Sequence, residues 1–254
     1  MTLVRSTPGA VWRITLDRPE ARNAVTASML GELTAELGRA AADPSARVVL
    51  LTGEGKDFCA GADLDELEAA AGTEGSVGYA LPLEGALDAI VEHPLPVVAG
   101  IQGAALGAGC QIAVAADLVV AAEDARLGIP SARLGVVMGF ENVRRLVDAV
   151  GPARAREMLL AARIVTGAQA AAWGLVNEAV PANGLASRSL ELAGEAAGGA
   201  PLSVRASKRG IRLALRGAGP EEFDMMAAEA MASGDLREGI RAFRERRPPR
   251  FDGA

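Results

Sequence analysis

The sequence contains little of the chemistry that most metal and redox sites require. A single histidine and two cysteines stand among its 254 residues, whereas zinc sites need three or four such ligands close together. We therefore expect no metal site. Cys59 and Cys110 lie in unrelated contexts, which indicates reduced thiols in a cytoplasmic protein and not a disulfide. His93 lies between Glu92 and Pro94; we interpret it as a helix-end residue and not as the base of a Ser–His–Asp triad.

The sequence also lacks an excess of basic charge and a membrane segment. Its 26 Lys and Arg residues are outnumbered by 32 Asp and Glu residues, so the formal net charge is −6. This balance argues against a nucleic-acid or anionic-membrane surface. The N-terminus has no long apolar core of the kind that signal peptides carry. The apolar stretch 95–122 is interrupted by four glycines and by Asp117, so it predicts a strand–turn–helix–strand unit within a soluble core.

Strand and helix patterns alternate over the first two thirds of the chain. Residues 11–16 alternate apolar and polar side chains, as in a half-buried strand, and the run 48–52 reads as a buried strand. Together with the helical spacings between them, these patterns favour a parallel α/β architecture up to about residue 180. The small, polar segment 72–78 predicts a mobile loop, and a helix is expected to resume over 83–92.

Beyond Pro181 the pattern is helical only. We expect helices over 184–198, 202–216, 220–232 and 235–246, and farther back over 141–149 and 153–162. Two clusters of basic residues, within 205–212 and 241–247, are interpreted as solvated helix faces, with contacts to phosphate groups as the alternative.

Two segments of small residues follow predicted buried strands. One runs Phe-Cys-Ala-Gly-Ala-Asp-Leu over 58–64, and the other runs Gly-Ala-Ala-Leu-Gly-Ala-Gly-Cys over 103–110. Small residues let the backbone approach a ligand and leave amide N–H groups uncovered. The second segment opens a helix, whose N-terminal end carries partial positive charge. Two amides that converge on one point would form an oxyanion hole; close packing at tight turns is the alternative.

Eight stretches in order resemble the enoyl-CoA hydratase/isomerase (crotonase) superfamily over nearly the full length of the chain. They are residues 16–24, 51–64, 94–110, 116–118, 130–135, 151–155, 170–177 and 237–243. The resemblance implies an α/β fold in which a spiral of ββα units, residues 1–195, binds acyl-CoA. It implies a C-terminal helical trimerisation region over 196–254, and hence a homotrimer or a dimer of trimers. The implied ligand is an acyl-CoA thioester; CoA enters as part of the substrate and no separate cofactor is expected.

The resemblance also implies the site residues. It assigns the oxyanion hole to the backbone amides of Ala60 and Ala108. The implied substrate-binding positions are Arg22, Ala60, Gly61, Ala62, Asp63, Leu64, Gly107 and Gly139. Among these, 60–64 would contact the CoA adenine, Arg22 would lie near the CoA phosphates, and Gly139 would lie beside the acyl pocket.

The sequence departs from the family at both catalytic glutamates. Gln111 and Ser131 stand at those positions, and neither side chain exchanges a proton near neutral pH as a carboxyl group does. Glu141 is the candidate substitute proton carrier; a helix-start acid stabilised by the helix dipole is the alternative. Two hypotheses remain open: a lyase or isomerase that acts on a specialised acyl-CoA, or a non-catalytic acyl-CoA-binding protein that has lost its acid and base.

Overall fold

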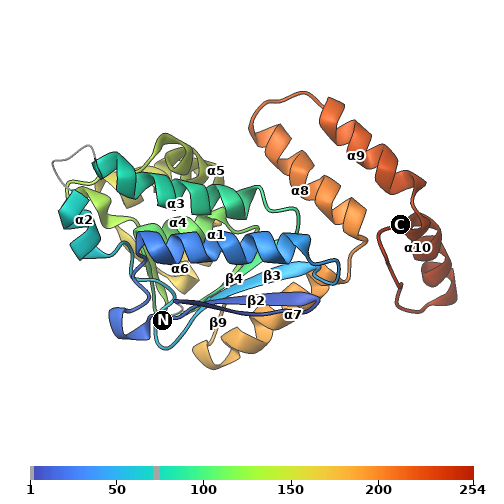
Figure 1. Ribbon diagram of the computed structural model, residues 1–254, viewed down its shortest axis with the longest axis horizontal. Helices are drawn as coiled ribbons and strands as arrows, with labels where there is room; N and C mark the ends of the chain where they lie inside the picture. The colour runs from blue at the N-terminus through green and yellow to red at the C-terminus, as the bar shows by residue number, and fades with distance from the viewer. Residues whose placement is uncertain (1–2, 71–74) are drawn as a thin grey trace.

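The chain folds into two sheets surrounded by helices. The computed structural model describes residues 3–70 and 75–254 (Figure 1). The strands are β1 (Val4–Thr7), β2 (Val11–Leu16), β3 (Val48–Gly53), β4 (Val97–Ile101), β5 (Ala104–Leu106), β6 (Leu118–Ala122), β7 (Arg126–Gly128), β8 (Ile164–Thr166) and β9 (Glu178–Val180). The α-helices are α1 (Ala27–Ala42), α2 (Leu64–Ala70), α3 (Gly75–Val91), α4 (Ala108–Ala115), α5 (Phe140–Leu160), α6 (Gly167–Trp173), α7 (Leu185–Ala197), α8 (Pro201–Leu215), α9 (Glu221–Ala232) and α10 (Gly234–Glu245). Short 3-10 turns are η1 (Pro19–Ala21), η2 (Pro130–Arg133) and η3 (Ala182–Gly184).

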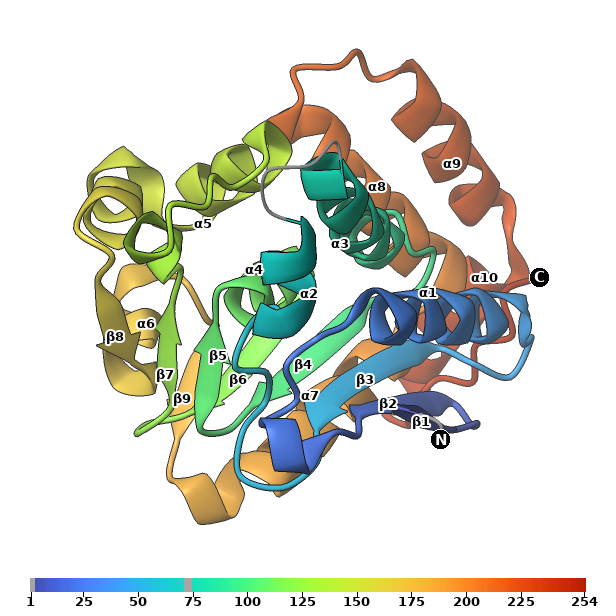
Figure 2. The same cartoon turned by 60° about the vertical axis from the view of Figure 1, so that its left-hand side comes forward.

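The order of the strands confirms the α/β spiral. The larger sheet has the order β1-β2-β3-β4-β6-β9, and the smaller sheet has the order β5-β7-β8. The chain passes from β4 in the large sheet to β5 in the small sheet and then into α4. It repeats the passage from β6 to β7 and then into α5 (Figure 2). Each turn of the spiral is therefore two strands and a helix. Only β1 runs antiparallel to its neighbour in the large sheet.

The centre of the large sheet is buried on both faces. Helices α1 and α3 pack together over one face, and α7 packs on β3 and β4 from the other (Figure 1). Strands covered on both faces carry continuous apolar runs, which explains why 48–52 and 97–101 lack alternation. In β2, Trp12, Ile14 and Leu16 are buried while Arg13 is exposed, as the alternation predicted.

Two helices differ from the expected bounds. Helix α3 begins at Gly75, so residues 75–78 are helical and not part of a loop; residues 72–74 of that predicted loop lie outside the described residues. Packing of α3 along α1 outweighs the low helix propensity of its glycines. The two helices expected over 141–149 and 153–162 are both present within α5, and they meet without a loop at Gly151, whose φ of 71° and ψ of 165° are not helical.

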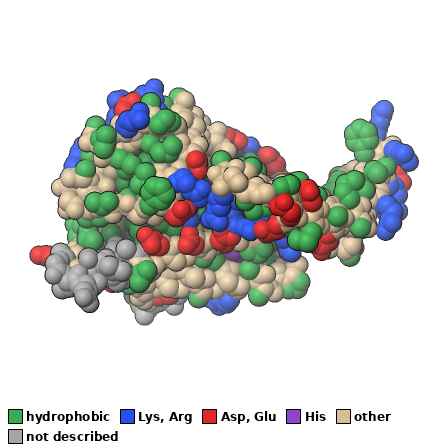
Figure 3. Space-filling model, turned by 90° about the horizontal axis from the view of Figure 1, so that it is seen from above, with side chains coloured by type: hydrophobic (Ala, Val, Ile, Leu, Met, Phe, Trp, Pro, Cys, Tyr) green, Lys and Arg blue, Asp and Glu red, His purple; other side chains and the backbone are tan. Residues whose placement is uncertain are grey.

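The C-terminal helices leave the sheet. The predicted helices after residue 184 match α7, α8, α9 and α10 to within two residues. Helices α8 and α9 pack side by side and α10 follows α9 (Figure 1); in the space-filling view they form an arm that projects from the body (Figure 3). Within residues 3–70 and 75–254, no helix is both long and apolar enough to cross a membrane.

A polar cluster attaches α8 to the body. The Lys208 ammonium group donates to Asp117 Oδ2 at 2.6 Å, to the Leu95 carbonyl at 3.1 Å and to the Ile90 carbonyl at 3.3 Å. Asp117 also accepts from the backbone N–H of Val97 at 2.7 Å. One lysine thus joins α8 to the end of α3 and to the segment before β4.

The buried His93 lies just beyond α3 and has a structural position. Its Nε2 lies 3.0 Å from the Leu37 carbonyl, and its Nδ1 accepts from the Leu95 N–H at 3.2 Å. Burial lowers the pKa of His93. Because backbone groups occupy both ring nitrogens, the ring is not available to a nucleophile.

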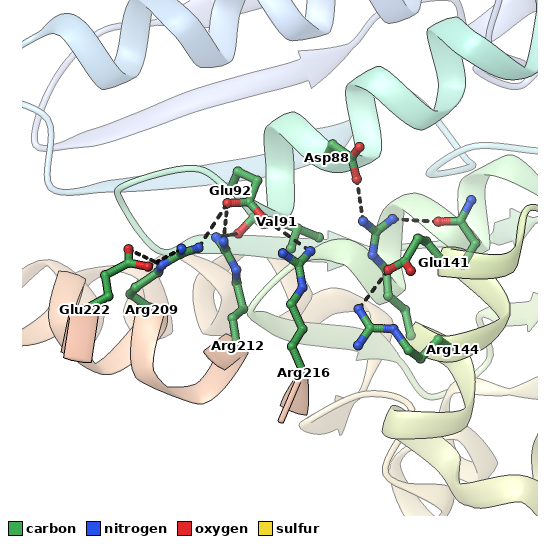
Figure 4. Close-up of polar contacts among 11 residues, drawn as sticks. Asp88, Val91, Glu92, Glu141, Arg144, Arg209, Arg212, Arg216 and Glu222 are labelled. Atoms are coloured by element: carbon green, nitrogen blue, oxygen red, sulfur yellow. Dashed lines mark hydrogen bonds and ion pairs between the residues drawn. The ribbon is translucent and has the colours of Figure 1, made fainter. Parts of the chain in front are cut away.

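The basic residues of α8 are paired with acids. Arg209 binds Glu222 at 2.5 Å, and Arg212 and Arg216 bind Glu92 at the end of α3 (Figure 4). On α10, Arg241 and Arg247 bind Glu238. For the paired residues this favours ion-paired helix faces over phosphate sites, whereas the Lys208 side chain is only 9% exposed and does not lie on a solvated face.

Candidate functional site

The two segments of small residues lie side by side. Cys59 N–H donates to the Ala104 carbonyl at 2.9 Å, and Leu106 N–H donates to the Cys59 carbonyl at 3.0 Å. A Cβ on Gly61 would lie 3.2 Å from the Leu106 carbonyl oxygen, and one on Gly107 would lie 3.8 Å from the Gly61 Cα. Both glycines have positive φ, 127° and 53°, a region that L side chains rarely adopt. The sequence uses glycine here because two backbones touch.

The structure contradicts Ala60 as a free amide donor. Its N–H donates to the Arg22 carbonyl at 3.0 Å. The free amide on this turn belongs to Ala62. The residues on either side of Ala62 are bonded to Val25. The Val25 N–H donates to the Gly61 carbonyl at 2.8 Å, and the Asp63 N–H donates to the Val25 carbonyl at 2.9 Å. In extended backbone, successive residues point their N–H groups to opposite sides, so the Ala62 N–H turns away from Val25. No described residue accepts a hydrogen bond from it.

Ala108 supplies a second unpaired amide. It is buried and is the first residue of α4, where N–H groups lack partners within the helix. Its neighbours are paired: Gly107 N–H donates to the Gly128 carbonyl at 2.9 Å, and Gln111 N–H donates to the Gly107 carbonyl at 3.1 Å. Over the described part of the chain, nothing accepts from the Ala108 N–H. Unpaired amides on two touching segments are the groups that can bind a carbonyl oxygen that gains negative charge.

The charged residues of the predicted ligand-binding segment are already engaged. Arg22 binds Asp57 through Nε at 2.7 Å and Nη2 at 3.1 Å, and this contact lowers the pKa of Asp57. Asp63 binds Arg18 at 2.6 Å and accepts from the first amides of α2; the hydrogen bond from Arg18 lowers the pKa of Asp63. Asp63 therefore organises the loop. Leu64, by contrast, exposes its apolar side chain.

Gln111 and Ser131, which the resemblance aligns with catalytic glutamates, both belong to segments near Ile129. Gln111, on α4, lines a small cavity with Val114, Ile129, Asn142, Arg145 and Leu146. Ser131 lies in η2, two residues beyond Ile129. Both side chains are uncharged amides or alcohols, so the geometry gives neither of them a means to carry a proton between substrate atoms.

Glu141 does not face the Gln111 cavity with its neighbour Asn142. Its side chain is 55% exposed and pairs with Arg144 at 2.7 Å on the same helix (Figure 4). This favours the helix-start interpretation. A second carboxylate lies beside the start of α5: the exposed Glu84 of α3 contacts Gly139. Its spacing of four residues from Asp88 and eight from Glu92 within a predicted helix is the signal that could have identified it.

Other reactive groups give no second site. Burial raises the pKa of both Cys59 and Cys110 to about 12, so both remain thiols. Among the described residues, no three His, Cys, Asp or Glu side chains come close enough to hold a metal ion.

Comparisons with known proteins identify the family. The sequence pattern of the family described as enoyl-CoA hydratase/isomerase matches residues 6–254. The chain is 37% identical to the 2,3-dehydroadipyl-CoA hydratase of Escherichia coli K12 over 99% of this chain and 98% of that protein. It is 36% identical to the carnitinyl-CoA dehydratase of Proteus mirabilis, over 98% and 97%. A solved enoyl-CoA hydratase/carnithine racemase from Magnetospirillum magneticum superposes with a TM-score of 0.94 at 33% identity, over 100% of this chain and 97% of that one. The chain belongs to the enoyl-CoA hydratase/isomerase family.

Proposed function

We propose that this protein binds an acyl-CoA thioester and polarises its carbonyl group with the amides of Ala62 and Ala108. The observation that carries the proposal is that both N–H groups are unpaired on touching segments. When a thioester becomes an enolate, negative charge develops on its oxygen, and fixed N–H donors stabilise that charge. Each such donor contributes about 3 kcal/mol to lowering a barrier.

The rest of the ligand would lie along the first segment. The backbone of 60–64 and the exposed Leu64 side chain would contact the adenine end of CoA. Arg22 would lie near the phosphates, where its guanidinium can remain paired with Asp57. CoA would enter as part of the substrate, so the proposal includes no separate cofactor. A cytoplasmic location stays a prediction.

The reaction that fits this site is hydration, dehydration or isomerisation of an enoyl thioester through an enolate. The names of two relatives, 2,3-dehydroadipyl-CoA hydratase and carnitinyl-CoA dehydratase, support a lyase whose substrate carries a polar acyl group. The second candidate is a non-catalytic acyl-CoA-binding protein. It is favoured by the absence of a carboxyl group at Gln111 and Ser131 and requires that no other carboxylate replaces them.

Two ligands that differ only at the carbonyl test the binding proposal. We expect octanoyl-CoA to bind at least about fivefold more tightly than octyl-CoA, its thioether analogue, in isothermal titration calorimetry. The thioether lacks the oxygen that would accept from Ala62 and Ala108, and two hydrogen bonds contribute about 1–3 kcal/mol in total. Equal affinity for the two ligands, or binding of neither, would contradict the proposal.

We also propose that the arm of α8, α9 and α10 joins copies of this chain into a trimer or a dimer of trimers. Large apolar side chains are exposed on α9 and α10: Phe223, Met225, Met231, Leu236, Ile240 and Phe243. A projecting apolar surface of this kind marks an interface. Light scattering should give three or six times the chain mass of 25.9 kDa; a mass of one chain would exclude the assembly.

A further inference from the structure

Helix α3 carries a row of acidic residues toward the helices beside it. Glu84, Asp88 and Glu92 are four residues apart, so they lie on one face of the helix. Asp88 binds Arg145 of α5 at 2.5 Å, and Glu92 binds the arginines of α8 (Figure 4). Two of the three acids therefore hold α3 to its neighbours.

Glu84 is the exception in this row. In the part of the chain that the structure describes, its carboxylate has no hydrogen bond and no ion pair. Its Oε1 lies against the backbone of Gly139, where a methyl group would collide with it. The same methyl position lies 3.7 Å from Nδ2 of Asn142. The free carboxylate thus lies at the point where α5 begins.

Asn142 and Gln111 relate this position to the helix that carries Ala108. Asn142 is buried and lines the same small cavity as Gln111. Gln111 follows Ala108 by three residues in α4, so the two lie on one face of that helix. Because Arg145 occupies the Asn142 Oδ1 at 2.6 Å, the Nδ2 group of Asn142 remains on the side of Gly139 and Glu84. Asn142 therefore lies near Gln111 on one side and near Glu84 on the other.

We propose that Glu84 is the proton carrier of this site, an inference that rests on the proposed function. A carboxylate that an arginine already binds is not free to accept a hydrogen bond from a water molecule or a substrate. Asp88, Glu92 and Glu141 each bind an arginine, whereas Glu84 does not. Glu84 thereby takes the role that Gln111 and Ser131 cannot perform.

One carboxylate suffices for the whole addition of water to an enoyl thioester. Glu84 accepts a proton from a water molecule as the water oxygen bonds to Cβ. The electron pair of the Cα=Cβ bond moves toward the thioester oxygen, which the amides of Ala62 and Ala108 hold. The resulting enolate then takes the proton from the Glu84 carboxyl group at Cα. This restores the carboxylate, and the net change is one water added across the double bond.

Exchange of the Cα protons of octanoyl-CoA in D₂O tests Glu84 without knowledge of the natural acyl group. NMR would follow exchange in the wild-type protein, in Glu84→Gln, and in Asp148→Asn as a matched control that neutralises another exposed carboxylate, on α5. We expect Glu84→Gln to lower the exchange rate and the kcat for crotonyl-CoA hydration by about 10²–10⁴-fold. The Kd for octanoyl-CoA should change less than about threefold, because the amide donors are intact. Asp148→Asn should match the wild type, and Glu84→Asp should retain part of the rate.

The outcomes separate this inference from the proposed function. Wild-type exchange in Glu84→Gln, or no exchange in a wild-type protein that binds octanoyl-CoA, would overturn Glu84 as proton carrier and leave the thioester site standing. Loss of octanoyl-CoA binding in Glu84→Gln would assign the residue to binding and also overturn the proposal. A wild-type protein that does not bind octanoyl-CoA would overturn the proposed function itself.

Discussion

Gly109→Ala should lower crotonyl-CoA turnover by at least about 10²-fold and octanoyl-CoA affinity by about tenfold. A Cβ on Gly109 would collide with the Cys59 carbonyl oxygen and would lie 2.8 Å from Cys59 Cβ and 2.9 Å from its carbonyl carbon. These atoms belong to the backbone and a buried side chain, so they cannot rotate away. Either α4 or the turn at Cys59 must move, and a displacement of about 1 Å at a reacting group costs about 10²-fold in rate.

The same substitution should also destabilise the protein. Adding a methylene-sized group to a tightly packed interior costs about 1–3 kcal/mol. Gly38→Ala is the matched control, because no atom lies within 4 Å of a Cβ at that position in α1. It should leave binding unchanged and raise the free energy of unfolding by about 0.5–1 kcal/mol. Calorimetry with octanoyl-CoA and thermal melts of both variants check this pair; wild-type affinity in Gly109→Ala would show that the two segments are not held in contact.

Lys208→Met should lower the free energy of unfolding by about 3 kcal/mol. Burial lowers the pKa of Lys208, and the nearby Asp117 carboxylate counters part of that effect. Removing the ammonium group would leave Asp117 without its cation and the carbonyls of Ile90 and Leu95 without their donor. We expect a loss of unfolding free energy at the low end of the range for broken buried salt bridges, because the Asp117 side chain is 28% exposed. In a chain of this size Tm should fall by about 6–12 °C.

The double variant Asp117→Asn/Lys208→Met separates charge from packing. It removes the unpaired carboxylate, so it should recover part of the stability that Lys208→Met loses. Lys56→Met, at an exposed lysine, should change stability by less than about 0.5 kcal/mol. Urea unfolding followed by circular dichroism measures all three variants. A loss under about 1 kcal/mol in Lys208→Met would mean that the cluster does not hold α8 to the body.

The sequence predicts the order of elements well because the strongest patterns lie where burial is one-sided or complete. The alternation at Trp12 and Ile14 and the apolar run at Val48 follow directly from which faces are covered. The helices after residue 184 could be read from their spacing and the Gly and Pro residues between them. The start of helix α3 was predicted too late in the sequence. Gly75 and Gly78 have low helix propensity, and the packing of α3 on α1 that supports a helix there is not visible in the sequence.

The identity of the amide donors required contacts that spacing does not carry. Ala60 and Ala62 both lie in the glycine-containing segment, and sequence alone cannot tell which N–H is free. The backbone of Val25 hydrogen-bonds to Gly61 and Asp63 and leaves the Ala62 N–H free. The carbonyl of Arg22 accepts the Ala60 N–H. Glu84 was missed for a similar reason. Asp88 binds an arginine and Glu84 does not. This difference depends on where α5 and α8 place their arginines, which the sequence does not reveal.

The three acids of α3 fix the rotational setting of that helix. Asp88 meets α5, Glu92 meets α8 and Glu84 meets Gly139, all from a single face. Adding or deleting one residue within this span would turn one end relative to the other by about 100°. Proteins that keep this arrangement should therefore show no insertions or deletions between Glu84 and Glu92.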